Sequence, residues 1–205
     1  LEELFVVAWW EQRGSGISYD PASADRPITL GLMVEDTLAV ADYLRSRFDV
    51  EKLYLMAHSG GSFIGVTAAA RAPEKFAAYI AVAQIVDSRE SEALAYEYML
   101  SRYRAAGDGR MVRELEGFPA ARGGETPPGY PMLRDVAMHD LGVGTMRSMR
   151  SIVTGLLLPS LAFPEYTISE KYHFWAAKAR SGIASLWSEM TADDLRERIG
   201  RLEIP

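Results

Sequence analysis

The sequence predicts an α/β fold built on a parallel sheet. Between residues 4 and 86, three apolar stretches alternate with two segments of helical periodicity. The apolar stretches are hydrophobic on both faces, which is typical of strands buried on both sides of a parallel sheet. Strand, helix, strand, helix and strand in this order favour right-handed crossovers, so this part of the chain is expected to form an α/β core.

The elements of this core follow one another from the start of the chain. The run LFVVAWW (4–10) is rich in β-branched and aromatic residues and is bounded by the glycine-rich RGSG, which predicts a buried strand. Residues 34–48 carry apolar side chains at helical spacing with charged residues off that stripe, which predicts an amphipathic helix. The same reasoning predicts the remaining elements, which are strands at 52–57 and 77–86 and a helix of small residues at 62–72.

From residue 88 onward the pattern becomes helical. A proline- and glycine-rich loop is expected at 117–131. The helices are expected at 90–106, 145–158, 168–179 and 191–199. We therefore divide the chain into an incomplete core, a helical insertion and the start of the next core strand, which are residues 1–87, 88–200 and 201–205.

Composition excludes several classes of protein. A net charge of −6 argues against a nucleic-acid partner, which normally requires a clustered basic face. A run of about 18 apolar residues and a basic leader are both lacking, so neither a membrane span nor a signal peptide is expected. With no cysteine in the sequence, disulfides, thiolate metal sites and cysteine nucleophiles are excluded, and a cytoplasmic location is expected.

The stretch MAHSGGS places a serine between a predicted strand and a predicted helix. A serine nucleophile at such a turn needs small residues two positions before and after it, because the backbone closes tightly and strains the serine. Ala57 and Gly61 occupy these positions. We therefore predict that Ser59 is a nucleophile and that the backbone N–H of Gly60 donates to the oxyanion at the positive end of the helix. The alternative is that Ser59 only caps the helix.

Two stretches together carry a family resemblance. WWEQRGSGISYD, followed by LYLMAHSGGSFIGVTAAARAPEKFAAYIAVAQ, resembles the α/β-hydrolase superfamily and in particular its proline iminopeptidase-like branch. The resemblance is specific over residues 4–86, and the helical remainder looks like that branch's cap domain. It implies an α/β-hydrolase-type sheet with a helical cap, and a serine hydrolase that cleaves an amide or ester through an acyl-enzyme without a cofactor or metal.

On this family plan the chain looks like an internal fragment. It opens with Leu1 rather than Met and stops at RLEIP, where an apolar strand would begin. The resemblance places the first oxyanion loop before the chain, and the catalytic acid and histidine after it. The chain by itself is thus expected to lack a complete triad, and the alternative to an enzyme is a non-catalytic binding module or an inactive remnant of the same fold.

The three histidines are not expected to act as the base. His58 precedes the nucleophile, and adjacent residues on a strand point to opposite faces, so we expect it to pack under the turn. His139 and His173 lie in the helical insertion. Asp87 follows the strand after the serine, where a minority of α/β-hydrolases keep their acid; the alternative is a cap that opens the insertion.

The resemblance also implies how a substrate is recognised. A short peptide with a free N-terminus needs a carboxylate for its ammonium group, and the family places that carboxylate in the cap. Glu92 and Glu97, in ESEALAYEYM, are the candidates, and the alternative for both is a solvated helix face. A small molecule or short peptide is the expected substrate; peptidase or esterase chemistry and the oligomeric state are left open.

Overall fold

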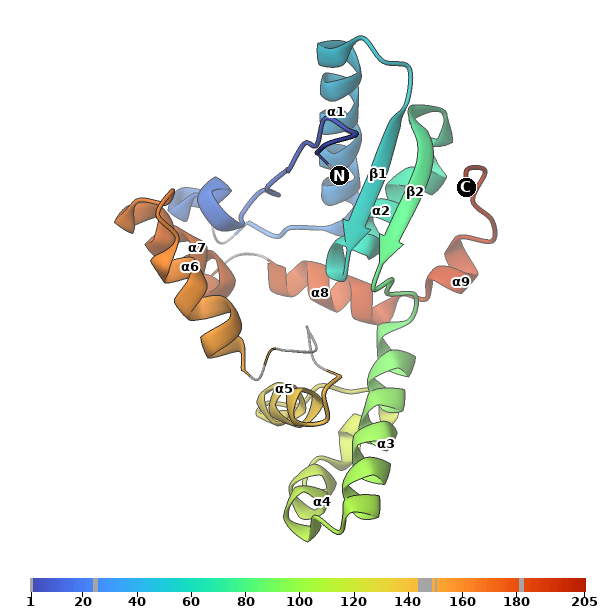
Figure 1. Ribbon diagram of the computed structural model, residues 1–205. Helices are drawn as coiled ribbons and strands as arrows, with labels where there is room; N and C mark the ends of the chain where they lie inside the picture. Colours follow the sequence, from blue (N-terminus) through green and yellow to red (C-terminus); the bar gives the residue numbers. More distant parts are fainter. Residues whose placement is uncertain (1, 24–25, 144–148, 150, 181–182) are drawn as a thin grey trace. The chain divides into compact units, whose positions relative to one another are not determined.

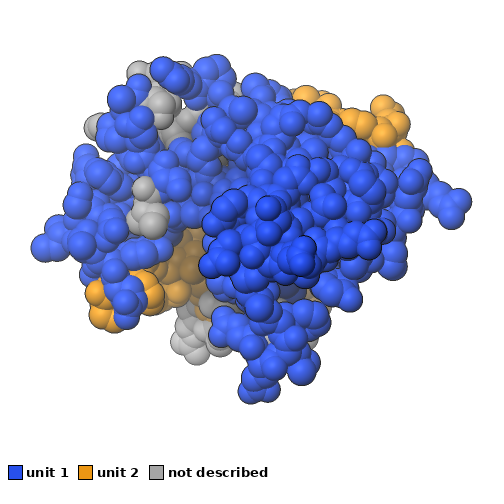
Figure 2. Space-filling model, turned by 90° about the horizontal axis from the view of Figure 1, so that it is seen from above, with its two compact units in different colours: residues 1–84, 165–190, 199–205 blue, residues 85–164, 191–198 orange. Residues whose placement is uncertain are grey.

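The structure is a computed structural model that describes residues 2–23, 26–143, 149, 151–180 and 183–205 (Figure 1). The chain divides into two compact units (Figure 2). Unit 1 comprises Leu1–Gln84, Glu165–Met190 and Ile199–Pro205, and unit 2 comprises Ile85–Pro164 and Thr191–Arg198. Each unit has its own set of buried apolar side chains.

Unit 1 contains a two-stranded parallel sheet. Its main elements in chain order are α1 (Leu30–Phe48), β1 (Leu53–His58), α2 (Gly60–Arg71) and β2 (Phe76–Val82). α2 is the crossover helix between the strands, and it packs against both of them and against α1 (Figure 1). The predicted α/β fold class is therefore confirmed.

Helix α1 begins where side chains satisfy its free N–H groups and ends at a residue in the left-handed conformation. The Thr29 hydroxyl accepts a hydrogen bond from the backbone N–H of Leu32 at 3.2 Å, and the Glu189 carboxylate accepts one from the N–H of Leu30 at 2.7 Å. Both groups satisfy N–H groups that a helix cannot pair internally. At the other end, Asp49 adopts a left-handed conformation with φ of 50° and terminates the helix.

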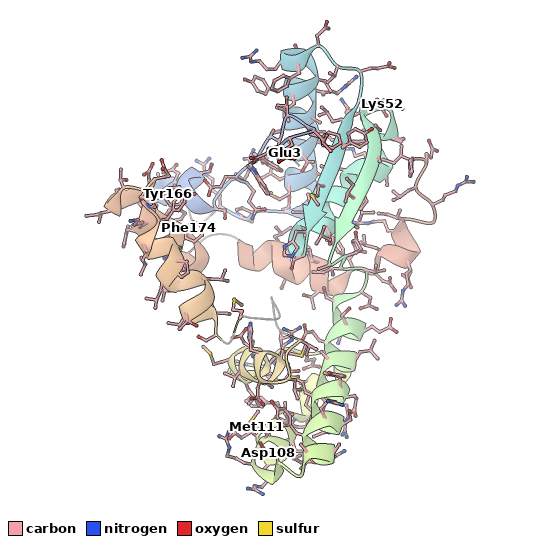
Figure 3. The ribbon with its side chains drawn as sticks, viewed as in Figure 1. Glu3, Lys52, Asp108, Met111, Tyr166 and Phe174 are labelled. Carbon is pink, nitrogen blue, oxygen red and sulfur yellow. The ribbon has the colours of Figure 1, made fainter. Side chains whose placement is uncertain are left out.

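The remaining elements of unit 1 are short or lie late in the chain. They are η1 (Gly16–Ser18), η2 (Pro21–Ser23), η3 (Pro73–Lys75), α7 (Ile168–Arg180) and α8 (Ile183–Ala192), the last of which ends in unit 2. α7 contacts η1, and the His173 and Tyr19 rings meet edge to face at 6.1 Å between centroids. The rings of Tyr166, just before α7, and Phe174, within it, lie side by side with their centroids 6.4 Å apart (Figure 3).

Unit 2 is helical over its described residues. Its elements are α3 (Ser88–Ala106), α4 (Gly109–Glu116), η4 (Pro119–Gly123), α5 (Tyr130–Asp140), the π-helical turn η5 (Val153–Leu157), α6 (Leu158–Ala162) and α9 (Leu195–Arg198). Asp108 caps α4 by accepting hydrogen bonds from the N–H groups of Arg110 and Met111, at 3.1 and 3.0 Å (Figure 3). The core joins α3, α4, η4 and α5 and contains Tyr96, Met99, Leu100, Tyr103, Met111, Leu115, Ala121, Tyr130 and Ala137.

The predicted strand at 4–10 is wrong. This stretch is irregular, and Leu4, Val6 and Trp9 are 84%, 76% and 86% exposed. A strand is stabilised by hydrogen bonds to a neighbouring strand, and in the described part of the chain β1 and β2 pair only with each other. Apolar composition alone therefore does not create a strand at this position.

The helical half differs from its prediction in detail. The helices predicted at 90–106 and 168–179 are confirmed as α3 and α7, whereas 191–199 contains the end of α8 and the separate four-residue α9. The sequence does not predict α4, α5 or α8, and α5 begins inside the loop predicted at 117–131. Pro131 lies in the first turn of α5, where a missing N–H costs nothing, so it starts a helix instead of breaking one. Part of the helix predicted at 145–158 lies outside the described residues.

The bounds of the two compact units differ from the predicted division of the chain. Residues 165–190 belong to unit 1, whereas the sequence analysis placed them in the insertion at 88–200. Residues 201–205 form no strand, but the backbone N–H of Tyr79 in β2 donates to the carbonyl of Pro205 at 2.9 Å. The start of a further core strand there, and a cap with its own function, stay predictions. No helix in the described ranges combines the length and apolar character needed to cross a bilayer.

Candidate functional site

Ser59 lies at the turn from β1 into α2 and has a strained backbone. Its φ is 52° and its ψ is −127°, which L-residues rarely adopt. The N–H of Ser59 still donates to the carbonyl of Val82 at 2.9 Å, so the strand pairing continues up to the turn. Such strain has a free-energy cost of about 1 to 3 kcal/mol and is concentrated at functional sites. The strand-to-helix turn expected of a nucleophilic serine is present in the structure.

The Ser59 hydroxyl does not cap the helix. Ser59 occupies the N-cap position, but its side chain makes no capping hydrogen bond, and the residue is exposed. Ser62 instead ties the turn together, because its backbone N–H and its hydroxyl both donate to the carbonyl of Ser59, at 2.8 and 2.5 Å. Among the described residues of unit 1 the Ser59 hydroxyl therefore has no hydrogen-bond partner.

Gly60 is the first residue of α2. The N–H groups of a helix's first turn have no intrahelical acceptor, and the helix dipole makes that end positive. Gly60 is half-buried, and a Cβ atom added to it would lie 3.9 Å from the Met190 methyl group. Its N–H is thus oriented as a donor to an anionic group at this end of the helix; its role as an oxyanion donor stays a prediction.

Strain at Ser59 leads to a stability prediction. Glycine adopts positive φ without a steric penalty, so Ser59→Gly should relieve the strain at the turn. We expect Ser59→Gly to be more stable to chemical unfolding than Ser59→Ala by about 1 kcal/mol, even though both variants lack the hydroxyl. Equal midpoints in urea for the two variants would show that the turn is not strained.

The close approach of backbones occurs at a different glycine from the one predicted. A Cβ atom at Gly61 would meet no described atom within 4 Å, so the small residue is not required there by packing. At Gly65, one turn further along α2, a Cβ atom would lie 2.7 Å from the Cβ of Ala57 and 3.0 Å from the ring of Tyr79. Ala57 and Gly65 together allow α2 to pack tightly on β1 and β2.

None of the histidines forms a hydrogen bond to Ser59 in the described structure. His58 is exposed at the end of β1, so the expectation that it packs under the turn is wrong. His139 is buried in unit 2, with its Nδ1 atom 2.8 Å from the carbonyl of Asp135 and 3.2 Å from the Asp135 carboxylate. His173 lies against Tyr19 in unit 1.

Asp87 is the N-cap of helix α3. One carboxylate oxygen accepts a hydrogen bond from the N–H of Glu90 at 2.9 Å, and the other is 2.9 Å from the Arg196 guanidinium. Asp87 also forms an isolated β-bridge with Asp194. Both carboxylate oxygens are thus engaged within unit 2 as the capping alternative expects, and a role as catalytic acid stays a prediction.

Glu92 and Glu97 lie on α3, and each is paired with an arginine. Glu92 is 2.6 Å from Arg134 and its side chain is 16% exposed, whereas Glu97 is 2.6 Å from Arg122 and its side chain is 52% exposed. An ion pair is weaker where water screens it, so Glu92 is the stronger candidate for binding an ammonium group. A substrate amine would have to share that carboxylate with Arg134.

Three residues near the turn were missed by the sequence analysis. Ser62 is fully buried, and its carbonyl lies 2.9 Å from the hydroxyl of Tyr79 and 3.4 Å from the Nε2 atom of Gln84. Burial raises the pKa of Tyr79 to about 12, so its hydroxyl stays protonated at neutral pH. The one local signal for Ser62 is its position three residues after Ser59, in the first turn of the predicted helix. Among the described side chains, no group of three or more metal-binding residues is arranged to hold an ion.

Comparison with known proteins finds relatives for the part of the chain that contains Ser59. Residues 2–106 match the family model described as serine aminopeptidase, S33. The chain is also 34% identical over 99 residues to "Probable aminopeptidase YbaC" of Bacillus subtilis (strain 168), over 48% of this chain and 31% of that protein. The chain therefore spans about a third of the length of this curated relative. No solved structure matches the chain significantly. Because the family model covers half of the chain, the chain belongs to the serine aminopeptidase S33 family of the α/β-hydrolase superfamily.

Proposed function

We propose that the complete protein is a serine hydrolase that removes N-terminal residues from short peptides, in the manner of a proline iminopeptidase. The observation that carries the proposal is the backbone of Ser59, which holds a non-glycine residue at φ of 52° while its hydroxyl stays exposed and uncapped. Strain of this kind is concentrated at functional sites, and a sharp strand-to-helix turn is the context in which a nucleophilic serine occurs, so both features support a nucleophile over a structural serine.

The proposed reaction is acyl transfer in two steps. The Ser59 oxygen bonds to the substrate carbonyl carbon while a base takes the hydroxyl proton, and the N–H of Gly60 stabilises the oxyanion. The bond to the leaving group then breaks as the base returns that proton to the leaving nitrogen or oxygen. Water, activated by the same base, hydrolyses the acyl-enzyme and regenerates Ser59.

The base and its orienting acid are not assigned to a residue. A base must lie within about 2.6 to 3.2 Å of the hydroxyl, directly or through one water. His139 is a poor candidate, because it is buried in unit 2 and its Nδ1 atom is held by Asp135. The expectation from the resemblance, that both groups lie outside these 205 residues, stays a prediction.

The substrate class rests on the family and on unit 2. The matched family and the relative are both described as aminopeptidases, which supports a peptide substrate with a free amine. Unit 2 offers two carboxylates on one helix, Glu92 and Glu97, for that amine. We propose that unit 2 acts as the cap that selects the substrate and that Glu92 contributes most to it.

A matched pair of substrates tests the aminopeptidase assignment. Prolyl-2-naphthylamide has a free ammonium group, whereas its N-acetyl derivative has the same scissile bond without the charge. We expect the complete protein to cleave the free form at least about 100-fold faster in kcat/KM, because the N-acetyl form lacks the positive charge that a carboxylate of the site would bind. Equal rates would refute aminopeptidase specificity, and p-nitrophenyl acetate as the best substrate would indicate an esterase.

A further inference from the structure

A second strained residue lies beside the Ser59 turn. Ala83, directly after β2, has φ of 51°. Each of the two parallel strands is therefore followed, at its carboxyl end, by a non-glycine residue with positive φ. The two ends are joined, because the N–H of Ser59 donates to the carbonyl of Val82. A positive φ at a non-glycine residue costs free energy, and strain of this kind is concentrated at functional sites.

Gln84, the residue after Ala83, contacts both Tyr79 and Ser62. The Oε1 atom of Gln84 lies 2.8 Å from the hydroxyl of Tyr79, and its Nε2 atom lies 3.4 Å from the carbonyl of Ser62. The Tyr79 hydroxyl itself lies 2.9 Å from that same carbonyl. The side chain of Tyr79, in β2, and that of Gln84, just after β2, therefore both contact the carbonyl of Ser62 in the first turn of α2.

Ser62 connects Tyr79 and Gln84 to Ser59. Its hydroxyl and its N–H both donate to the carbonyl of Ser59, so movement of Ser62 would move the Ser59 peptide. Ser62 is fully buried, and the absence of a side chain at Gly65 leaves room for the Tyr79 ring beside it. The chain of contacts from Gln84 and Tyr79 through Ser62 to Ser59 is continuous and lies entirely within unit 1.

We propose that Tyr79 and Gln84 are positioning residues that hold the Ser59 hydroxyl and the Gly60 N–H in their reactive orientation. Neither residue touches the substrate in this proposal; both act through the Ser62 carbonyl. The inference rests on the proposed serine mechanism and adds to it the groups that keep the turn in its strained conformation. Loss of either group lets the turn relax, which lowers the rate of attack without removing the nucleophile.

Tyr79→Phe in the complete protein tests the inference, because it removes the hydroxyl and keeps the ring against Gly65. We expect about a tenfold lower kcat on prolyl-2-naphthylamide and about a tenfold lower rate constant for phosphonylation by a fluorophosphonate, with KM changed by less than about twofold. Tyr43→Phe is the matched control, because Tyr43 is 65% exposed on α1, and it should leave both rates unchanged.

Gln84→Ala provides the second, independent variant. We expect it to lower the same two rates, and Tyr79→Phe combined with Gln84→Ala to be little slower than Tyr79→Phe alone, since both act on one carbonyl. A merely structural role would lower the melting temperature and leave the rate per folded molecule at 25 °C unchanged. Wild-type rates in folded Tyr79→Phe, or in Gln84→Ala if the first variant does not fold, would overturn the inference. The serine mechanism is judged separately by Ser59→Ala.

Discussion

Alanine in place of Ser59 is expected to reduce hydrolysis by the complete protein to near background. Loss of the nucleophile from a serine triad lowers kcat by about 10⁴ to 10⁶, because only substrate binding and oxyanion stabilisation remain. The fold should persist, because the Ser59 side chain makes no capping bond and is exposed. The measurement is turnover of prolyl-2-naphthylamide alongside the thermal midpoint of the purified variant.

Ser46→Ala is the control for this prediction. Ser46 is an exposed residue of α1, so its replacement removes a serine hydroxyl outside the turn and should leave turnover unchanged. A Ser59→Ala variant that kept more than about 1% of wild-type kcat would be incompatible with Ser59 as the nucleophile.

Gly65→Ala is expected to have the largest effect on stability. The new Cβ atom would lie 2.7 Å from the Cβ of Ala57 and 3.0 Å from the Tyr79 ring. The Ala57 methyl group is attached to the backbone of β1 and cannot rotate away, so α2 must move off the sheet. Overpacking of this kind destabilises a protein by about 1 to 3 kcal/mol, which exceeds the gain of up to about 1 kcal/mol from alanine's higher helix propensity.

Gly61→Ala is the matched control on the same helix. A Cβ atom at Gly61 meets no described atom within 4 Å, so the substitution should be neutral or slightly stabilising. Urea unfolding of both variants measures the difference. If Gly65→Ala were as stable as Gly61→Ala, the tight contact of α2 with β1 and Tyr79 would be disproved. Because Tyr79 belongs to the same contact, Gly65→Ala should also lower the phosphonylation rate of Ser59.

The local part of the site could be predicted from the sequence. Ser59 lies between an apolar strand and a small-residue helix, and both the strand and the helix form within two residues of the predicted bounds. Short-range patterns determine such turns, because the residues that shape them are neighbours in the chain. Gly61 shows the limit of this reasoning, since the residue that packing restricts is Gly65.

The long-range part of the site could not be predicted in this way. The contact of Tyr79 and Gln84 with Ser62 depends on the register between β1 and β2 and on the left-handed turn at Ala83. Neither is encoded in a local pattern. The strand expected at 4–10 is wrong for the same reason, because a strand depends on a partner elsewhere in the fold.

The helical half of the chain was predicted less completely. Pro131 indicated a loop, but a proline in the first turn of a helix is compatible with α5. The arginine partners of Glu92 and Glu97 lie 42 and 25 residues further along the chain, so sequence spacing gave no sign of either ion pair. Each of these pairs partly neutralises the charge of its glutamate.

Labelling of the complete protein with a fluorophosphonate, followed by mass spectrometry of its peptides, tests the central claim most directly. Only an activated serine is phosphonylated at a useful rate. We predict one adduct, on the peptide that contains Ser59, and none after denaturation in urea or in Ser59→Ala. No adduct on the folded protein, or an adduct on a different serine that persists in Ser59→Ala, would contradict the account and favour a non-catalytic protein of this fold or another nucleophile.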